Sequence, residues 1–118
     1  MKHDEHLFQC KVVEELTMMG IPCFSVPNHL LKHGLAESKR EIAAGLRKGA
    51  PDLIAGGCGK CFWLELKTEV GRQSLEQKAF QQLAPLFGAT YVVVRKMEDL
   101  KCVIDQCRAD IVNRNRNS

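Results

Sequence analysis

Three charged residues interrupt a stretch of chain that otherwise has the composition of two buried strands. Asp52 opens the apolar run DLIA, and Glu65 and Lys67 lie within a second run, CFWLELK. Successive side chains of a strand point to opposite faces, so Glu65 and Lys67 share one face and the leucines beside them share the other. The segment between the runs, GGCGK, predicts a turn that pairs them as a hairpin. We therefore expect two carboxylates and a lysine at one edge of a sheet.

These residue types predict metal-assisted phosphodiester hydrolysis. Two buried carboxylates in contact repel each other, and one takes up a proton unless a cation compensates the charge. Mg²⁺ suits such a site because it prefers oxygen ligands and keeps bound water, and Mn²⁺ is expected to substitute for it. The ion polarises a phosphoryl oxygen and makes bound water a better nucleophile. Asp52 and Glu65 are then metal ligands, and Lys67 positions the water or stabilises charge in the transition state.

A simpler interpretation makes the same residues structural. Glu65 and Lys67 would be surface charges on a half-exposed sheet, and Asp52 would cap a turn after Pro51. An isolated Glu-x-Lys pattern favours this interpretation, because three-residue patterns often arise by chance. A longer pattern is therefore needed to decide between the two.

The N-terminal half is expected to contain a helix, a strand and a weaker second helix. Residues 4–19 have apolar side chains at the spacing of an amphipathic helix, and Gly20 ends it. Residues 21–26 have the composition of a short strand, closed by a proline-containing turn. Residues 35–46 are polar and only weakly helical. Residues 52–55 and 61–67 are the expected strands of the hairpin.

The C-terminal half is expected to add a helix, a strand and a last helix. A capping-box sequence starts a helix over residues 74–87. Residues 90–94, TYVVV, form a continuous apolar run that suits the buried middle of a sheet. The last helix is expected from residue 97 to about 112, followed by a polar tail, 113–118, that we expect to be disordered. The residues expected to pack the capped helix are Leu75, Ala79, Leu83 and Leu86.

This order of elements predicts an α/β fold. The strand, helix, strand passage from residue 61 to residue 94 implies a right-handed parallel crossover next to the antiparallel hairpin. We therefore expect a mixed sheet of about four strands flanked by helices on both faces. With 118 residues, the chain, residues 1–118, is expected to form one domain.

Composition narrows the compartment and the partners. No apolar run approaches the roughly 18 residues of a membrane span, and the N-terminus has no signal-peptide pattern, so we expect a cytoplasmic protein without a membrane partner. The formal net charge of +3 is too small to indicate a polyanionic partner by itself. Basic side chains are concentrated in residues 29–48, where they either face phosphates or form a solvated helix face.

Six cysteines raise the possibility of a rival metal site. Cys58 and Cys61 have the spacing of a zinc knuckle, and Cys102 and Cys107 are the candidates for the remaining two ligands. Residues five apart on a helix lie roughly 140° apart around its axis, so Cys102 and Cys107 do not share a face. We therefore expect reduced cysteines and no zinc site.

Taken together, the motifs resemble the VRR-Nuc family, the virus-type replication and repair nucleases, in its short stand-alone phage form. A Pro-Asp pair, a hairpin and Glu-x-Lys are the signature of the PD-(D/E)XK nuclease superfamily to which that family belongs, and Pro51, Asp52, Glu65 and Lys67 fill every position. The resemblance extends from about residue 4 to residue 100. The motifs that carry it are E-x-x-x-Q (Glu5, Gln9), V-P-N (Val26 to Asn28), G-x-P-D-L (Gly49 to Leu53), L-E-L-K-T (Leu64 to Thr68) and G-R-x-S-x-x-Q (Gly71 to Gln77).

The resemblance implies a restriction-endonuclease-like core and two further site residues. Glu5 matches an acidic residue of the first helix that joins the metal shell in the family, with Glu14 and Glu15 as competing candidates. Gln77 matches a glutamine that orients water or phosphate, so it is placed with the catalytic residues. A capping box formed by Ser74 and Gln77 explains the same glutamine by helix initiation alone, and both roles are compatible.

The resemblance also implies a Mg²⁺-dependent endonuclease that acts on branched DNA, since stand-alone members look like Holliday-junction resolvases. Symmetric cleavage of two strands needs two active sites, so we expect a homodimer. The alternatives are a nuclease for flap or single-stranded DNA or RNA, and a non-catalytic DNA-binding module on the same fold. The residues expected to contact nucleic acid are Asn28, Lys39, Arg40, Arg47, Lys48 and Arg72.

Overall fold

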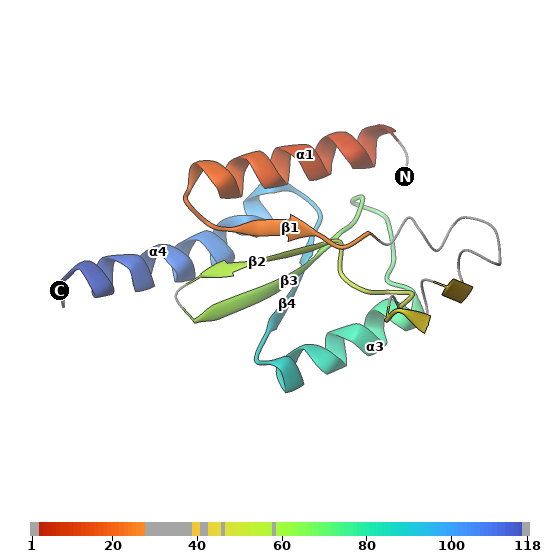
Figure 1. Cartoon of the computed structure of the whole chain (residues 1–118). Coiled ribbons are helices and arrows are strands. Elements are labelled where there is room, and N and C mark those ends of the chain that lie inside the picture. The colour runs from red at the N-terminus through yellow and green to blue at the C-terminus, as the bar shows by residue number, and fades with distance from the viewer. Residues whose placement is uncertain (1–2, 28–38, 41–42, 46, 58, 117–118) are drawn as a thin grey trace.

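The computed structural model describes residues 3–27, 39–40, 43–45, 47–57 and 59–116 (Figure 1). The helix expected over residues 35–46 therefore lies largely outside the described residues. The helices and strands, with η for 3-10 turns, are α1 (His3–Met18), β1 (Cys23–Ser25), β2 (Leu53–Gly57), β3 (Lys60–Leu66), α3 (Leu75–Leu83), η2 (Ala84–Phe87), β4 (Thr90–Val94), η3 (Met97–Leu100) and α4 (Lys101–Arg116).

The four strands form one mixed sheet in the order β1-β2-β3-β4. β2 pairs antiparallel with both β1 and β3, and β4 pairs parallel with β3. The hairpin is tighter than expected, because β2 continues through Gly56 and Gly57 instead of turning there, and Gly57 pairs with Lys60. A side chain at Gly56 would collide with the backbone of Lys60, so the strand continues only with glycine at this position.

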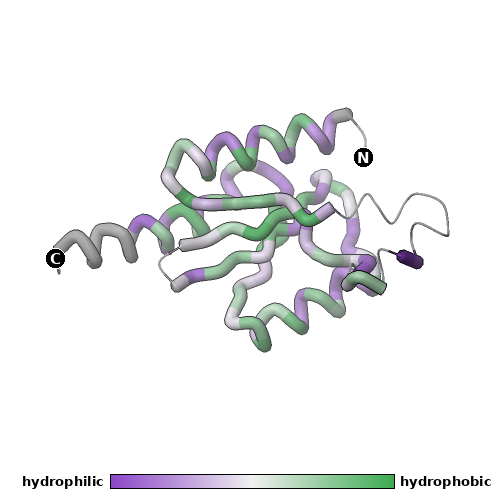
Figure 2. Tube along the Cα trace, viewed as in Figure 1, coloured by the Kyte–Doolittle hydropathy of each residue, from purple (hydrophilic) through white to green (hydrophobic). Residues whose placement is uncertain are grey.

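Helices cover both faces of the sheet, which confirms the predicted fold class (Figure 1). On one face, α1 and α4 pack against the alternate residues Leu53, Phe62 and Leu64. On the other face, α3 and η2 pack against a smaller cluster centred on Trp63. Figure 2 shows the hydrophobic residues concentrated along the strands between these helices. Along β3, Leu64 and Leu66 point to the face of the sheet that α1 and α4 cover, whereas Glu65 points to the other face, toward α3. The sequence predicted this separation.

The packing expected for the capped helix is wrong. α3 ends at Leu83 and η2 follows, since Pro85 lacks the amide hydrogen that would continue the α-helical pattern. The expected packing residues face solvent: Leu75 is 82 % exposed, Leu83 is 39 % exposed and Leu86 is 82 % exposed, and Ala79 is exposed too. The face toward the sheet instead contains Gln77, Phe80 and Ala84, at the spacing i, i+3, i+7.

The position expected for β4 in the sheet is also wrong. β4 is an edge strand, because in the described part of the chain it pairs with β3 alone, and helices on both faces account for its apolar composition. α4 contacts the core through Val103 and runs to Arg116, past the end expected at about residue 112. Once its first turns are docked, polar residues such as Asn and Arg extend a helix at a small cost in free energy.

None of the helices in the described part of the chain is long and apolar enough to span a membrane.

Candidate active site

A polar cavity of about 310 Å³ opens where β3 ends, between the first turns of α1 and α3. Five of the predicted site residues line it, although they come from four separate segments of the chain. The segment after β3 closes the remaining side. The lining residues are Glu5, Gln9, Asp52, Glu65, Leu66, Lys67, Thr68, Gly71 and Gln77.

Asp52 is fixed at the mouth of the hairpin by the backbone of β3. Its amide donates to the Leu64 carbonyl at 3.0 Å, and its Oδ2 accepts from the Leu66 amide at 2.8 Å. Burial raises the pKa of the Asp52 carboxyl above its ordinary value, against the opposing effect of the Leu66 hydrogen bond. The carboxylate therefore has a defined orientation at the base of the cavity.

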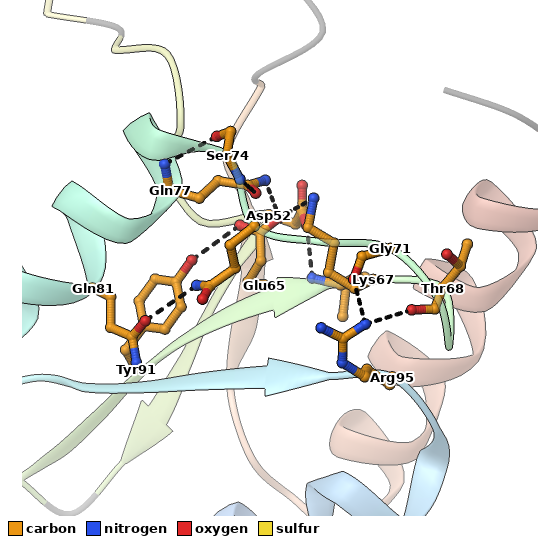
Figure 3. A network of polar contacts seen from close by, with 12 residues as sticks. Asp52, Glu65, Lys67, Thr68, Gly71, Ser74, Gln77, Gln81, Tyr91 and Arg95 are labelled. Carbon is orange, nitrogen blue, oxygen red and sulfur yellow. Dashed lines mark hydrogen bonds and ion pairs between the residues drawn. The ribbon is translucent and has the colours of Figure 1, made fainter.

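Glu65 is the most deeply buried charged residue of the site, with 2 % of its surface exposed. Its Oε1 accepts from Gln77 Nε2 at 2.6 Å and lies 4.0 Å from Lys67 Nζ. Its Oε2 accepts from the Tyr91 hydroxyl at 3.3 Å (Figure 3). Burial, and then repulsion by Asp52, raise the pKa of Glu65 from 4.5 to about 8. The cavity thus holds two carboxyl groups, and the positive charge of Lys67 is too small to keep both of them ionised near neutral pH.

Gln77 has both of the roles considered for it in the sequence. Ser74 Oγ accepts from the Gln77 amide at 3.1 Å, and Gln77 Oε1 accepts from the Ser74 amide at 2.8 Å, which is a complete capping box. Because the side-chain oxygen faces a backbone donor, the amide nitrogen must face Glu65. One side chain therefore starts α3 and orients a carboxylate of the cavity.

The architecture matches a solved structure described as a VRR_NUC domain. The TM-score is 0.61 and the sequence identity 20 %, over 86 % of this chain and 94 % of that one. The fold is that of a VRR_NUC domain. The expected fold class and the resemblance to the VRR-Nuc family are both confirmed at the level of the fold.

A second solved structure with a similar arrangement is that of the Holliday junction resolvase Hjc from the archaeal hyperthermophile Archaeoglobus fulgidus. It has a TM-score of 0.49 and a sequence identity of 21 %, over 76 % of this chain and 65 % of that chain. The sequence matches no protein-family model, and no curated protein sequence matches it.

The carboxylates of this VRR_NUC fold suit a hard divalent cation. Among the described residues, no three or more His, Cys, Asp or Glu side chains lie close enough together to hold a metal. Mg²⁺ typically needs only one or two carboxylates, with water and substrate oxygens as further ligands. Asp52 and Glu65 supply that pair. Burial raises the pKa of both carboxyls, so their ionised forms are costly unless a cation lies beside them. Glu5 lines the same cavity from α1 but is exposed.

Arg95 donates hydrogen bonds to the segment after β3, residues 68–71, which closes one side of the cavity. Arg95 follows β4 directly, and its Nη1 donates to the carbonyls of Thr68 at 2.8 Å and Gly71 at 2.5 Å (Figure 3). The same atom lies 3.4 Å from the Glu69 carbonyl. The amide of Arg95 in turn donates to Asp99 Oδ2 at 2.8 Å. One guanidinium group therefore fixes the turn that follows Lys67.

Sequence reasoning missed Tyr91 and Arg95. The continuous apolar run of β4 concealed Tyr91, but the parallel register pairs it with Trp63, on the face that Trp63 shares with Glu65. Period-two alternation along β4 is the signal that would have identified it. For Arg95 the signal is a charged residue directly after the apolar run of β4. This position lies at the same end of the strands as Lys67, which follows β3.

The basic residues predicted to bind nucleic acid lie at the surface where the structure describes them. Lys39, Arg40, Arg47 and Lys48 are exposed, as is Arg72, which follows the cavity-lining Gly71. Lys48 Nζ lies 3.6 Å from Glu76 Oε1 on the first turn of α3. Asn28 lies outside the described residues.

The cysteines that the structure describes lie outside any disulfide: Cys10, Cys23, Cys61, Cys102 and Cys107. Cys102 is exposed and Cys107 is buried, which confirms that the two do not share a face of α4. Cys58 lies outside the described residues, so the expectation for the Cys58 and Cys61 pair stays a prediction.

Proposed function

We propose that this protein is a divalent-metal-dependent endonuclease that hydrolyses phosphodiester bonds in DNA, with Mg²⁺ as the metal and Mn²⁺ as a substitute. The observation that carries the proposal is the convergence of Asp52, Glu65, Lys67 and Gln77 on one polar cavity of a VRR_NUC fold. Carboxylates and a cation at one solvent-accessible site are the groups that phosphodiester hydrolysis requires.

Asp52 and Glu65 hold the metal in this proposal. Glu5 lines the same cavity from α1 without forming a three-carboxylate cluster with them, and it contributes to the metal shell through bound water. When bound, the metal polarises a phosphoryl oxygen and lowers the pKa of its water. The protein contributes orientation, since the Leu66 amide holds Asp52, and Gln77 and Tyr91 hold Glu65. Such partners behind a ligand typically affect metal affinity or activity by 10- to 100-fold.

Lys67 is the cation of the site. Its side chain is 20 % exposed, and its Nζ lies 4.0 Å from Glu65 Oε1. An ammonium group at this position donates hydrogen bonds to the attacking water or to a phosphate oxygen on which charge develops. Lys67 therefore acts on the reacting groups, and Gln77 assists by orienting Glu65.

Branched DNA is the proposed substrate, and a homodimer is the proposed active form. The substrate follows from the resemblance of the motifs to stand-alone nucleases of the junction-resolving type. The dimer follows from symmetry, because paired cuts in two strands need two sites related by a twofold axis. The exposed basic residues, including Arg72 beside the cavity, provide the charge for backbone contacts.

A cleavage panel tests the proposal. Wild-type protein is incubated with a four-way junction, a flap, a duplex and a single strand, with Mg²⁺, with Mn²⁺ or with chelator. We expect metal-dependent cleavage of the junction, and a loss of at least ~100-fold in rate for Lys67→Ala, since it removes a group that stabilises charge in the transition state. Lys78→Ala, an exposed lysine on α3, is the matched control and should cleave normally.

The other outcomes of the panel identify the alternatives. Preferred cleavage of the flap or the single strand would replace the junction as substrate while keeping the chemistry. Binding without cleavage of any substrate would indicate a non-catalytic DNA-binding module. Wild-type rates for Lys67→Ala would remove Lys67 from the mechanism.

A further inference from the structure

A second cavity, of about 130 Å³, adjoins the proposed catalytic cavity. The two share Glu5, Leu66, Lys67 and Thr68 as lining residues, so they are separated only by the end of β3 and the segment after it. Their surfaces differ in character. The catalytic cavity is mainly polar, whereas Phe8 and Leu66 make the second cavity mainly apolar.

The size and lining of the second cavity suit one flat ring. Its volume is well below the roughly 300–1,000 Å³ of a site for a drug-sized ligand. Phe8 is half-buried against the core and also lines the cavity. Aromatic side chains of this kind are the usual stacking partners of unpaired nucleobases.

The charges around the second cavity favour a base over a phosphate. Asp4 and Glu5 lie at its edge on the first turn of α1, where their carboxylates repel phosphate and accept hydrogen bonds from the amino groups of bases. Arg95 and Lys67 also line this cavity, but Arg95 Nη1 already donates to three backbone carbonyls. Lys67 Nζ lies 4.0 Å from Glu65 Oε1 of the adjoining catalytic cavity, so its charge serves that site.

We propose that the second cavity binds an unstacked nucleobase of the DNA substrate, next to the phosphate that is cleaved. The inference rests on the proposed nuclease function, because the adjoining cavity must hold that phosphate. Unstacking a base from a duplex costs a few kcal/mol, and the cost is least where the base is already unpaired. The cavity therefore selects DNA with an unpaired or frayed nucleotide at the cleavage position, such as a branch point, over continuous duplex.

Binding measurements with abasic DNA test this inference independently of cleavage. Four-way junctions carry an abasic residue at each position around the mapped cut, and affinity is measured by fluorescence anisotropy with Ca²⁺ in place of Mg²⁺. We expect one position at which base removal weakens wild-type binding about tenfold, within the range for loss of one stacked base. Phe8→Leu should weaken binding of the intact junction by a similar factor, and Phe8→Tyr should not.

The decisive result is non-additivity of the two changes. In Phe8→Leu, the abasic residue at the sensitive position should cause little further loss, because the base has already lost its partner. Phe24→Leu, an exposed residue on β1 outside both cavities, is the matched control and should leave wild-type sensitivity to the abasic residue. Thermal melting shows that the variants are folded.

Two results would overturn the inference. One is that the abasic residue at the sensitive position lowers the DNA affinity of the wild type and of Phe8→Leu by the same factor. The other is the absence of any sensitive position with wild-type protein, a result that needs no variant. Metal-dependent junction cleavage combined with either of them would leave the proposed function standing and remove only the base-binding cavity. If none of the substrates in the panel is cleaved, the proposed nuclease function is contradicted, and the inference that rests on it fails with it.

Discussion

At the scale of single residues, the burial of Glu65 distinguishes the site from a surface salt-bridge network and suits a metal. The side chain is 2 % exposed and has polar contacts to Gln77, Tyr91 and Lys67. Even so, its pKa is raised to about 8, because burial and Asp52 outweigh the Lys67 cation. The interpretation of Glu65 and Lys67 as half-exposed surface charges is therefore wrong for Glu65.

The first prediction concerns stability and pH in the absence of metal. The folded state retains a proton on Glu65 up to a pH of about 8, whereas the unfolded chain loses it near 4.5. Stability should therefore decrease as pH rises from about 4.5 to 8 and then level off, by a few kcal/mol at most. Denaturant unfolding in chelator at several pH values measures this decrease.

Glu65→Gln is the matched control for the pH dependence. It has no proton to lose, so most of the decrease should disappear, with the remainder due to Asp52, whose pKa is raised in the same direction. Mg²⁺ should also reduce the decrease in the wild type, since a bound cation favours the ionised carboxylates. A wild-type stability that rises over this pH range would contradict the prediction.

The second prediction separates the two roles of Gln77. Ser74→Ala removes the capping hydroxyl and should cost about 1 kcal/mol of stability with little change in cleavage rate. Gln77→Ala also removes the donor to Glu65 and should lower the cleavage rate by ~10-fold or more. Unfolding curves and single-turnover rates measure the two effects. Equal loss of activity in both variants would show that Gln77 acts only through the helix.

At the scale of elements, four connections position the site. The hairpin register places Asp52 beside the end of β3, and the capping box directs Gln77 from the start of α3 toward Glu65. Gly49 lets the segment before β2 approach that same helix end, because a Cβ there would lie 2.5 Å from the carbonyl carbon of Glu76. Arg95 then fixes the turn after Lys67.

The third prediction tests Arg95 as a residue that positions this turn. Arg95→Lys keeps the charge, but the lysine ammonium lies one bond short of Nη1, the atom that contacts all three carbonyls, so stability should fall by about 1–3 kcal/mol. The cleavage rate should fall by ~10-fold, and hydrogen exchange should accelerate in residues 68–72. Arg108→Lys on the exposed side of α4 is the control. Lower activity with unchanged exchange in 68–72 would mean that Arg95 acts on the substrate instead.

At the scale of the whole molecule, the fourth prediction is a twofold dimer in solution. One chain presents one proposed catalytic cavity, so paired cuts in a four-way junction require two chains. Sedimentation at the protein concentrations used for cleavage should give twice the chain mass. A monomer that still makes paired cuts would contradict the prediction, and a monomer that nicks single strands or flaps would favour the alternative substrate.

The sequence by itself determined the order of elements and the group of charged residues. Alternation along β3 separates Glu65 and Lys67 from the leucines, and the glycine-rich turn makes the hairpin that brings Asp52 to them; both are local effects of strand geometry. The same local rules failed for α3, because several apolar residues suited packing and only the contact with Trp63 selected Phe80.

Only the tertiary structure decided what surrounds the carboxylates. Tyr91 reaches Glu65 through the parallel register of β3 and β4, and Arg95 reaches the turn after Lys67 across 24 to 27 residues of sequence. The position of β4 at the sheet edge and the second cavity beside Phe8 likewise depend on how distant segments pack. Composition and periodicity describe neighbours along the chain, and such contacts between distant segments are set by the packing of the whole core.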